Sequence, residues 1–201
     1  MVNILFHPLT TFIAGVLLTL VALGIFFVVS SPPNQTEEMV KTYNDAVAKS
    51  GGDDAAPDQV EGLERFTGFL QGIGSLDFVK EQTAKVYSKD AFLNDTLVTH
   101  HGLEEIEAYF LETAKTMTSF EVKIDDTARS GSDYYVRWTM IFAAPALAKG
   151  TVVHSVGMSQ VRFDGEGKVA FHQDFWDSGS YFYAQLPVSG VVLETIRKRL
   201  Q

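Results

Sequence analysis

The sequence predicts an α+β domain that follows one long apolar segment, and three observations lead to this prediction. Between residues 60 and 117, apolar side chains recur at the spacing of amphipathic helices. From Ser119 onward the apolar period switches to two, which is typical of strands. Near the N-terminus, residues 9–29 are almost wholly apolar. Helices followed by a run of antiparallel strands are the signature of an α+β domain, and a strongly curved sheet wrapped over the helices would enclose a cavity.

The N-terminal apolar segment predicts a membrane anchor. Residues 1–36 contain no Asp, Glu, Lys or Arg, and a helix over residues 9–29 would span about 30 Å, the thickness of a bilayer's hydrocarbon core. A cleaved signal peptide is the main alternative, but it would need a basic start and a shorter apolar stretch. We therefore expect a flank at 1–8, a single transmembrane helix at 9–29 and a polar tether at 30–58. Lys41 and Lys49 follow the segment and favour a cytoplasmic globular domain.

The globular domain is expected over residues 59–186. Its helices are predicted at 60–70, 76–87 and 102–117, and its strands at 91–95, 120–124, 135–142, 151–163 and 169–176. A short helix is also predicted in the tether, over residues 36–48. Residues 187–201 predict an amphipathic basic helix, which suits either an anionic membrane surface or packing on its own domain.

Composition excludes several classes of function. The formal net charge of −9 and the pI near 4.9 argue against nucleic-acid binding, which needs a concentrated basic surface. The chain has no cysteine, which excludes disulfides, thiolate metal sites and a cysteine nucleophile. Its five histidines lack the His-x-His or His-x-x-x-His spacing of metal ligands, so neither a metal nor another cofactor is predicted.

The strongest functional signal lies in the segment from Phe171 to Asp177. Side chains alternate faces along a strand, so His172, Asp174 and Trp176 share one side. A carboxylate among aromatic side chains is costly to bury unless a partner or a ligand uses it. The segment is therefore a candidate pocket wall. An Asp bonded to a neighbouring Arg or backbone amide in an ordinary core would give the same pattern.

Three motifs, together with the order of the elements, resemble the nuclear transport factor 2-like superfamily and, within it, the SnoaL-like branch. They are Tyr87 to Phe92 (YSKDAF), Gly102 to Phe110 (GLEEIEAYF) and His172 to Asp177 (HQDFWD). The resemblance covers about Gln59 to Leu186. It implies a cone-shaped domain in which a bent sheet and three helices surround an apolar pocket, often dimerised through the sheet. This fold hosts isomerases, hydrolases, cyclases, dehydratases and non-catalytic binders, so it does not by itself fix the chemistry.

One catalytic pattern of the superfamily is that of the ketosteroid isomerases. Asp95 matches their base, which follows the first strand. Phe66 and Ser159 occupy the places of their two oxyanion donors. Because Phe cannot donate a hydrogen bond and Ser is a weaker donor than a carboxylic acid, the resemblance disfavours steroid-type isomerisation.

Two further patterns point to the later strands. In the limonene epoxide hydrolase pattern, Asp174 and Arg137 match an Asp and the Arg, whereas Thr139 stands in place of the second Asp. In the pattern of SnoaL-like polyketide cyclases, Asp174 matches the single acid/base, with His172 or His154 nearby. An Arg between carboxylates would keep one of them ionised as a base. Arg137 and Asp174 could instead form an interior ion pair between adjacent strands.

The sequence therefore predicts a membrane-anchored SnoaL-like domain that binds a small lipophilic molecule in an apolar pocket. If it is an enzyme, Asp174 is the expected acid/base, assisted by Arg137 and Asp95. The expected pocket-lining residues are Phe66, Thr139, His154, Ser159, His172 and Trp176. A non-catalytic ligand-binding or dimerisation module at the membrane is the alternative, and a homodimer through the sheet is compatible with both.

Overall fold

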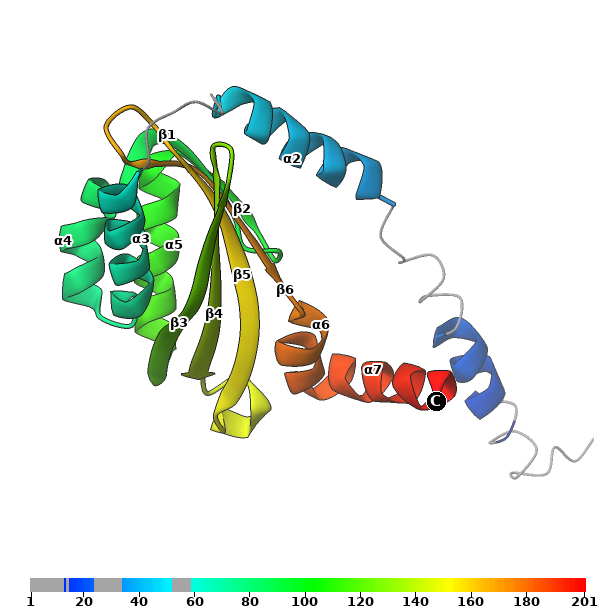
Figure 1. Ribbon diagram of the computed structural model, residues 1–201. Coiled ribbons are helices and arrows are strands. Elements are labelled where there is room, and N and C mark those ends of the chain that lie inside the picture. Colours follow the sequence, from blue (N-terminus) through cyan, green and yellow to red (C-terminus); the bar gives the residue numbers. More distant parts are fainter. Residues whose placement is uncertain (1–12, 14, 24–33, 52–58) are drawn as a thin grey trace, which may run out of the picture. The chain divides into compact units, whose positions relative to one another are not determined.

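A computed structural model describes residue 13 and residues 15–23, 34–51 and 59–201 of the chain (Figure 1). The chain divides into two compact units, residues 1–43 and 44–201. In the first unit, Ile13 and residues 15–23 are helical, and helix α2 (Thr36–Lys49) begins. The side chain of Asn34 caps α2 by accepting a hydrogen bond from the Thr36 amide at 3.1 Å. The helix predicted at 36–48 is thus confirmed.

The predicted N-terminal transmembrane helix needs correction. In the part of the chain that the structure describes, no helix is both long and apolar enough to cross a membrane. Within the predicted span, the helical residues 15–23 cover about 14 Å at 1.5 Å per residue, roughly half of a bilayer's hydrocarbon core. Residues 9–12, 14 and 24–29, and the flank predicted at 1–8, lie outside the described residues. This part of the fold-class prediction is therefore wrong.

The second unit is the predicted α+β domain, in which a curved sheet bends around helices (Figure 1). The helices are α3 (Val60–Gly72), α4 (Leu76–Val86) and α5 (Gly102–Thr116). The strands are β1 (Tyr87–Asn94), β2 (Thr99–His101), β3 (Ser119–Ser130), β4 (Asp133–Ala143), β5 (Val153–Phe163) and β6 (Val169–Trp176). A 3₁₀ turn, η1 (Ala148–Gly150), connects β4 to β5. The predicted periodicities thus give these helices and all of the strands except β2, with boundaries shifted by up to six residues.

Six strands form one sheet in the order β2-β1-β6-β5-β4-β3. All neighbouring pairs are antiparallel except β1 and β6, which run parallel. The sequence predicts an antiparallel sheet, and its pattern does not reveal the short strand β2. Parallel partners must be joined by a long crossover, so their pairing leaves no local turn signal in the sequence. The structure therefore corrects the sheet from antiparallel to mixed.

Aromatic side chains fill the core between the helices and the concave face of the sheet. Phe69 of α3 packs edge-to-face against Tyr87 of β1 and Phe110 of α5, with ring centroids 5.6 and 5.0 Å apart. Phe66, Phe69 and Tyr87 are at most 1% exposed. Edge-to-face pairs add roughly 0.5–1.5 kcal/mol each to the burial of the rings. This cluster fixes the helices against β1 and so positions the residues at the end of that strand.

The C-terminal region continues from β6 into α6 (Ser178–Tyr181), η2 (Tyr183–Gln185) and α7 (Pro187–Leu200). Asp177 caps α6 by accepting from the Ser180 amide at 2.9 Å. Helix α7 occupies the predicted basic helix at 187–201, begins with a proline and contains no buried residue. Its Arg197 donates to the Ser180 hydroxyl at 2.5 Å. Phe182, just before η2, lines the cavity described below.

Because Gly157 of β5 has no side chain, the indole of Trp138 can lie over it. Gly157 is paired with Trp138 of β4 on one side and with Trp176 of β6 on the other. A Cβ atom built at Gly157 would lie 2.3 Å from the Trp138 ring, far inside van der Waals contact. Because that atom is missing, the Trp138 indole reaches Ser159 and donates to its hydroxyl at 3.0 Å.

The Gly157→Ala substitution is expected to displace Trp138 and to lower the free energy of unfolding by about 1–3 kcal/mol, as overpacked cores do. Urea denaturation of the full chain would measure the loss. Gly165→Ala is the matched control, because a Cβ atom at Gly165 meets nothing within 4 Å. Equal stability of the two variants would contradict the close packing of Trp138 on Gly157.

Candidate functional site

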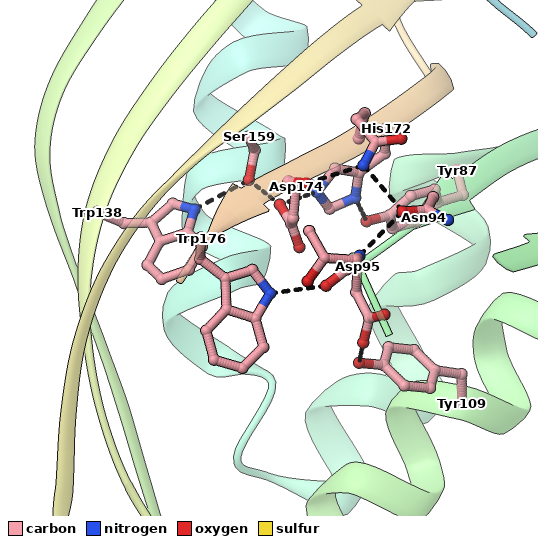
Figure 2. Close-up of polar contacts among 11 residues, drawn as sticks. Tyr87, Asn94, Asp95, Tyr109, Trp138, Ser159, His172, Asp174 and Trp176 are labelled. Carbon is pink, nitrogen blue, oxygen red and sulfur yellow. Dashed lines mark hydrogen bonds and ion pairs between the residues drawn. The ribbon is translucent and has the colours of Figure 1, made fainter. Parts of the chain in front are cut away.

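A cavity of about 130 Å³ lies between the concave face of the sheet and the helices α3 and α5. Most of its lining is apolar and aromatic. The polar side chains in the lining, apart from the two indoles, are those of Asp95, Tyr109, Thr113, Ser159, His172 and Asp174. Figure 2 shows that the carboxyl groups of Asp95 and Asp174 come from different strand ends to the same region. The cavity therefore combines an apolar interior with two acidic groups.

Asp174 of β6 is held by two donors on a single oxygen. The Ser159 hydroxyl donates to Oδ1 of Asp174 at 2.5 Å, and Nε2 of His172 lies 2.8 Å from the same oxygen. Ser159 Oγ accepts a hydrogen bond from the Trp138 indole, so its own hydroxyl proton can be donated to Asp174. Among the described residues, Oδ2 of Asp174 has no hydrogen-bond partner, and the side chain is 18% exposed. One carboxylate oxygen is thus anchored and the other is available.

His172 connects Asp174 to a buried tyrosine. Its Nδ1 lies 2.9 Å from the Tyr87 hydroxyl, and both residues are at most 1% exposed. The Phe66 ring packs edge-on against the imidazole at 5.0 Å. Burial, together with the nearby charge of Asp174, raises the pKa of Tyr87 well above its usual value. Tyr87 is therefore a neutral phenol that donates to Nδ1, and His172 donates from Nε2 to Asp174.

Asp95 follows β1 and closes the turn into β2. Its Oδ1 accepts from the amides of Leu97 and Val98, both at 2.8 Å, and its Oδ2 accepts from the Tyr109 hydroxyl of α5. The Asp95 backbone carbonyl accepts from the Trp176 indole at 2.7 Å. Three donors thus hold the Asp95 carboxylate, and two of them are backbone amides of its own turn, an arrangement typical of Asp in turns. The same turn thus holds both the Asp95 carboxylate and the Trp176 indole in place.

The negative charges of the site affect the pKa of Tyr109. Burial first, and then the charge of Asp95, its hydrogen bond and the charge of Asp174, raise the pKa of Tyr109 well above its usual value, against a small lowering by Thr113. Tyr109 therefore remains a hydrogen-bond donor to Asp95 over the physiological pH range.

The structure brings five of the sequence-predicted site residues together at the cavity: Asp95, Ser159, His172, Asp174 and Trp176. Phe66 is fully buried behind His172 and is not part of the lining. His172, Asp174 and Trp176 share one face of β6, as strand alternation indicated.

The remaining three predicted site residues lie elsewhere. Trp138 points into the cavity, so its neighbours Arg137 and Thr139 lie on the opposite face of β4. There Arg137 pairs with Asp125 at 3.6 Å, and Thr139 donates to the same carboxylate at 2.7 Å. His154 of β5 is exposed. Strand β5 separates β4 from β6, so the ion pair between Arg137 and Asp174 on adjacent strands is not formed.

Three residues of the site are not among the functional residues predicted from the sequence: Tyr87, Tyr109 and Trp138. Each occurs in an apolar pattern, which by itself indicates packing. Their signal was the polar end of an otherwise apolar side chain, because a buried Tyr or Trp needs a partner for its O–H or N–H. Among the described residues, no group of three or more His, Asp or Glu side chains is placed to hold a metal ion.

Removing the Tyr109 hydroxyl tests the support of Asp95. The Tyr109→Phe substitution should lower the free energy of unfolding by about 1.5–3 kcal/mol, because Asp95 loses a donor to a charged group. The raised pKa of Tyr109 means that its contribution is complete below about pH 10, the pKa of an unfolded tyrosine, and is lost as the pH rises further. Wild type should therefore lose more stability than the variant between pH 8 and 10.5.

Chemical denaturation at the two pH values would measure both effects. Tyr183→Phe is the control, because Tyr183 is 42% exposed and its hydroxyl has no partner among the described residues. A Tyr109→Phe protein as stable as this control would contradict the role of Tyr109.

Comparison with known proteins shows what the domain is similar to. Residues 75–172 match the family model described as the SnoaL-like domain. No curated protein matches the sequence. Three solved structures illustrate the likeness, and at their identities they establish the fold alone.

A protein of ketosteroid isomerase-like fold from Catenulispora acidiphila, solved in complex with trimethylamine, is 18% identical at a TM-score of 0.52, over 63% of this chain and 94% of that chain. A protein from Jannaschia sp. CCS1 described as a SnoaL-like polyketide cyclase is 15% identical at a TM-score of 0.52, over 67% and 97%. TsrD from Streptomyces laurentii is 17% identical at a TM-score of 0.51, over 65% and 97%. Residues 75–172 are therefore similar to the SnoaL-like domain, and the globular part of this chain has the fold of nuclear transport factor 2-like proteins.

Proposed function

We propose that the SnoaL-like domain binds a small, largely apolar molecule in its cavity and that Asp174 acts on this molecule as a general base. The observation that carries the proposal is the arrangement of Asp174: one oxygen is anchored by Ser159 and His172, and the other lies at an apolar cavity without a partner among the described residues. A base held in this way can take a proton from a bound molecule without rearranging first.

The size of the cavity limits the ligand. A cavity of about 150 Å³ holds one benzene molecule, and this cavity measures about 130 Å³. The part of the ligand that enters it is therefore about as large as a single six-membered ring. A four-ring steroid would not fit inside, which agrees with the disfavoured isomerase pattern at Phe66 and Ser159.

Hydrogen bonding supports the role of Asp174 as the acceptor of a proton. The buried chain from Tyr87 through His172 orients the carboxylate, and each group in it has a donor or acceptor as its neighbour. Asp95 is also at the cavity, but its carboxylate already accepts three hydrogen bonds. Of the two acids, Asp174 is thus the one with a free oxygen.

General-base catalysis by Asp174 can be tested with a substrate whose reaction needs only the removal of a proton by a base. When a base removes the ring C–H proton of 1,2-benzisoxazole, the N–O bond breaks and 2-cyanophenolate forms, which absorbs in the ultraviolet. The full chain should accelerate this ring opening, and Asp174→Asn should lower the rate by at least about 100-fold, the usual loss when a general base is removed. The asparagine can still accept from Ser159 and His172, so the fold should be retained.

Asp90→Asn is the matched control, because Asp90 is exposed on β1 and has no hydrogen bond or ion pair among the described residues. Asp90→Asn should react like wild type. If Asp174→Asn also reacts like wild type while remaining folded by circular dichroism, Asp174 is not the base, and the non-catalytic binding module is the better description.

A second candidate function, dimerisation through the sheet, is favoured by the outer sheet face. Val156 of β5 and Phe175 of β6 are 54% and 44% exposed on this face, and Met158 lies opposite Phe175 in the register. Exposed apolar side chains that adjoin one another on a sheet are typical of interaction surfaces. We infer that two copies of the chain associate through this face, which leaves the cavity on the opposite face free.

The Val156→Glu substitution should convert this dimer to a monomer, because two copies of a new charge would be buried against apolar partners. Light scattering coupled to size-exclusion chromatography of the full chain would measure the mass. Val60→Glu is the control, since Val60 is similarly exposed but lies at the start of α3, away from the sheet face. A wild-type chain that is already monomeric would remove this candidate.

A further inference from the structure

We propose that the ligand of the cavity is a small organic cation, a protonated alkylamine whose ammonium group binds Oδ2 of Asp174. This inference rests on the ligand-binding part of the proposed function, because it specifies which small molecule the cavity binds, and toward this ligand the Asp174 carboxylate serves as the counter-ion. It starts from the charge of the lining. Asp95 and Asp174 both line the cavity, and no Lys or Arg is among the described residues that line it.

Two shielded carboxylates outside the cavity have cationic partners. Asp133 is 16% exposed and pairs with Arg162 at 2.6 Å. Asp125 is 11% exposed and pairs with Lys123 at 3.1 Å. Asp174, at 18% exposed, has no Lys or Arg partner among the described residues. Burying a charge without an opposite charge is costly, so a cationic ligand would supply what the protein itself supplies at the other two sites.

The hydrogen bonds of His172 are satisfied without a positive charge. The Tyr87 hydroxyl has one partner among the described residues, Nδ1 of His172, and the tyrosine is fully buried. If His172 were protonated on both nitrogens, Nδ1 would become a donor and the phenolic proton would have no acceptor. A buried donor without an acceptor costs about 1–3 kcal/mol. The neutral imidazole, which accepts at Nδ1 and donates from Nε2, satisfies every group in the chain.

The hydrogen-bond donors of the lining are already used. The hydroxyls of Ser159 and Tyr109 donate to Asp174 and Asp95. The indoles of Trp138 and Trp176 donate to Ser159 and to the Asp95 carbonyl. An anionic or carbonyl ligand would find no free donor among these groups. A ligand that donates a hydrogen bond finds a free acceptor, Oδ2 of Asp174.

The aromatic lining suits a cation as well. Besides the two indoles, the lining contains the rings of Tyr109, Phe110, Phe120, Phe142 and Phe182. Aromatic faces attract ammonium groups, and this attraction is strongest where water is excluded. An alkylamine with about six non-hydrogen atoms matches the cavity volume. It also combines one positive charge with an apolar skeleton, which suits the mostly apolar lining.

Three probes of one carbon skeleton separate charge from shape. Cyclopentylamine is cationic at pH 7, cyclopentanol is a neutral donor, and cyclopentanone is a neutral acceptor. The chain has two tryptophans, and both line the cavity, so intrinsic fluorescence of the full chain reports binding directly. At matched ionic strength, the amine should bind at least about tenfold more tightly than the alcohol, and the ketone should bind most weakly.

Charge-matched variants exclude attraction by the overall negative charge. Asp174→Asn and Asp90→Asn change the net charge equally, but only Asp174 lines the cavity. The preference for the amine should persist in Asp90→Asn and disappear in Asp174→Asn. Persistence in a folded Asp174→Asn protein would overturn the assignment of the ammonium group to Asp174.

The wild-type comparison decides the proposal even if Asp174→Asn does not fold. If cyclopentanol or cyclopentanone binds as tightly as cyclopentylamine, the cationic ligand is wrong while ligand binding in the cavity stands. If none of the three probes changes the tryptophan fluorescence and none is retained in native mass spectrometry, ligand binding in the cavity fails together with this inference.

Discussion

The parallel pairing of β1 with β6 is the constraint on which the cavity depends. The register sets Leu93 opposite His172 and Asn94 opposite Gln173, and the Gln173 amide donates to the Asn94 side chain at 2.8 Å. Asp95, the next residue after β1, therefore emerges beside the end of β6 that carries Asp174. A shift of one residue would turn either strand's cavity side chains to the other face. Both acids reach the same cavity because these two strands are locked in this register.

A second consequence of the same pairing is the continuous buried polar chain. Tyr87 begins β1 and His172 lies on β6, and their contact links the start of the sheet to Asp174 and onward to Ser159 and Trp138. In a low-dielectric interior such a chain is strong only when every member has a partner. Here each internal donor has an acceptor, and the unused capacity is concentrated on one oxygen of Asp174. The chain thus stabilises the core and leaves, among the described residues, a single unpaired carboxylate oxygen at the cavity.

The two faces of the sheet divide the acidic residues into two classes. On the outer face, Asp125 is held by Lys123 and Arg137, which gives an ordinary solvent-side ion-pair cluster. On the cavity face, Asp95 and Asp174 are held only by neutral donors. Hydrogen bonds from neutral groups position a carboxylate but leave its charge uncompensated. This difference between the faces supports the proposals that the cavity holds a base and that it binds a cation.

The sequence by itself determined the helices α2, α3, α4, α5 and α7, five of the six strands and the side of β6 that carries His172, Asp174 and Trp176, because these follow from local periodicity. It also identified Ser159 and Asp95 through the resemblance to a known superfamily. It could not decide that Arg137 and Thr139 point away from the cavity. Which alternate side chains of a strand face the cavity depends on how that strand pairs with its neighbours in the sheet. Nor could it join Tyr87 to His172 across 85 residues, or reveal that β1 runs parallel to β6. Those facts arise only when non-local strands pair, and the partners of each buried polar group are set by that packing.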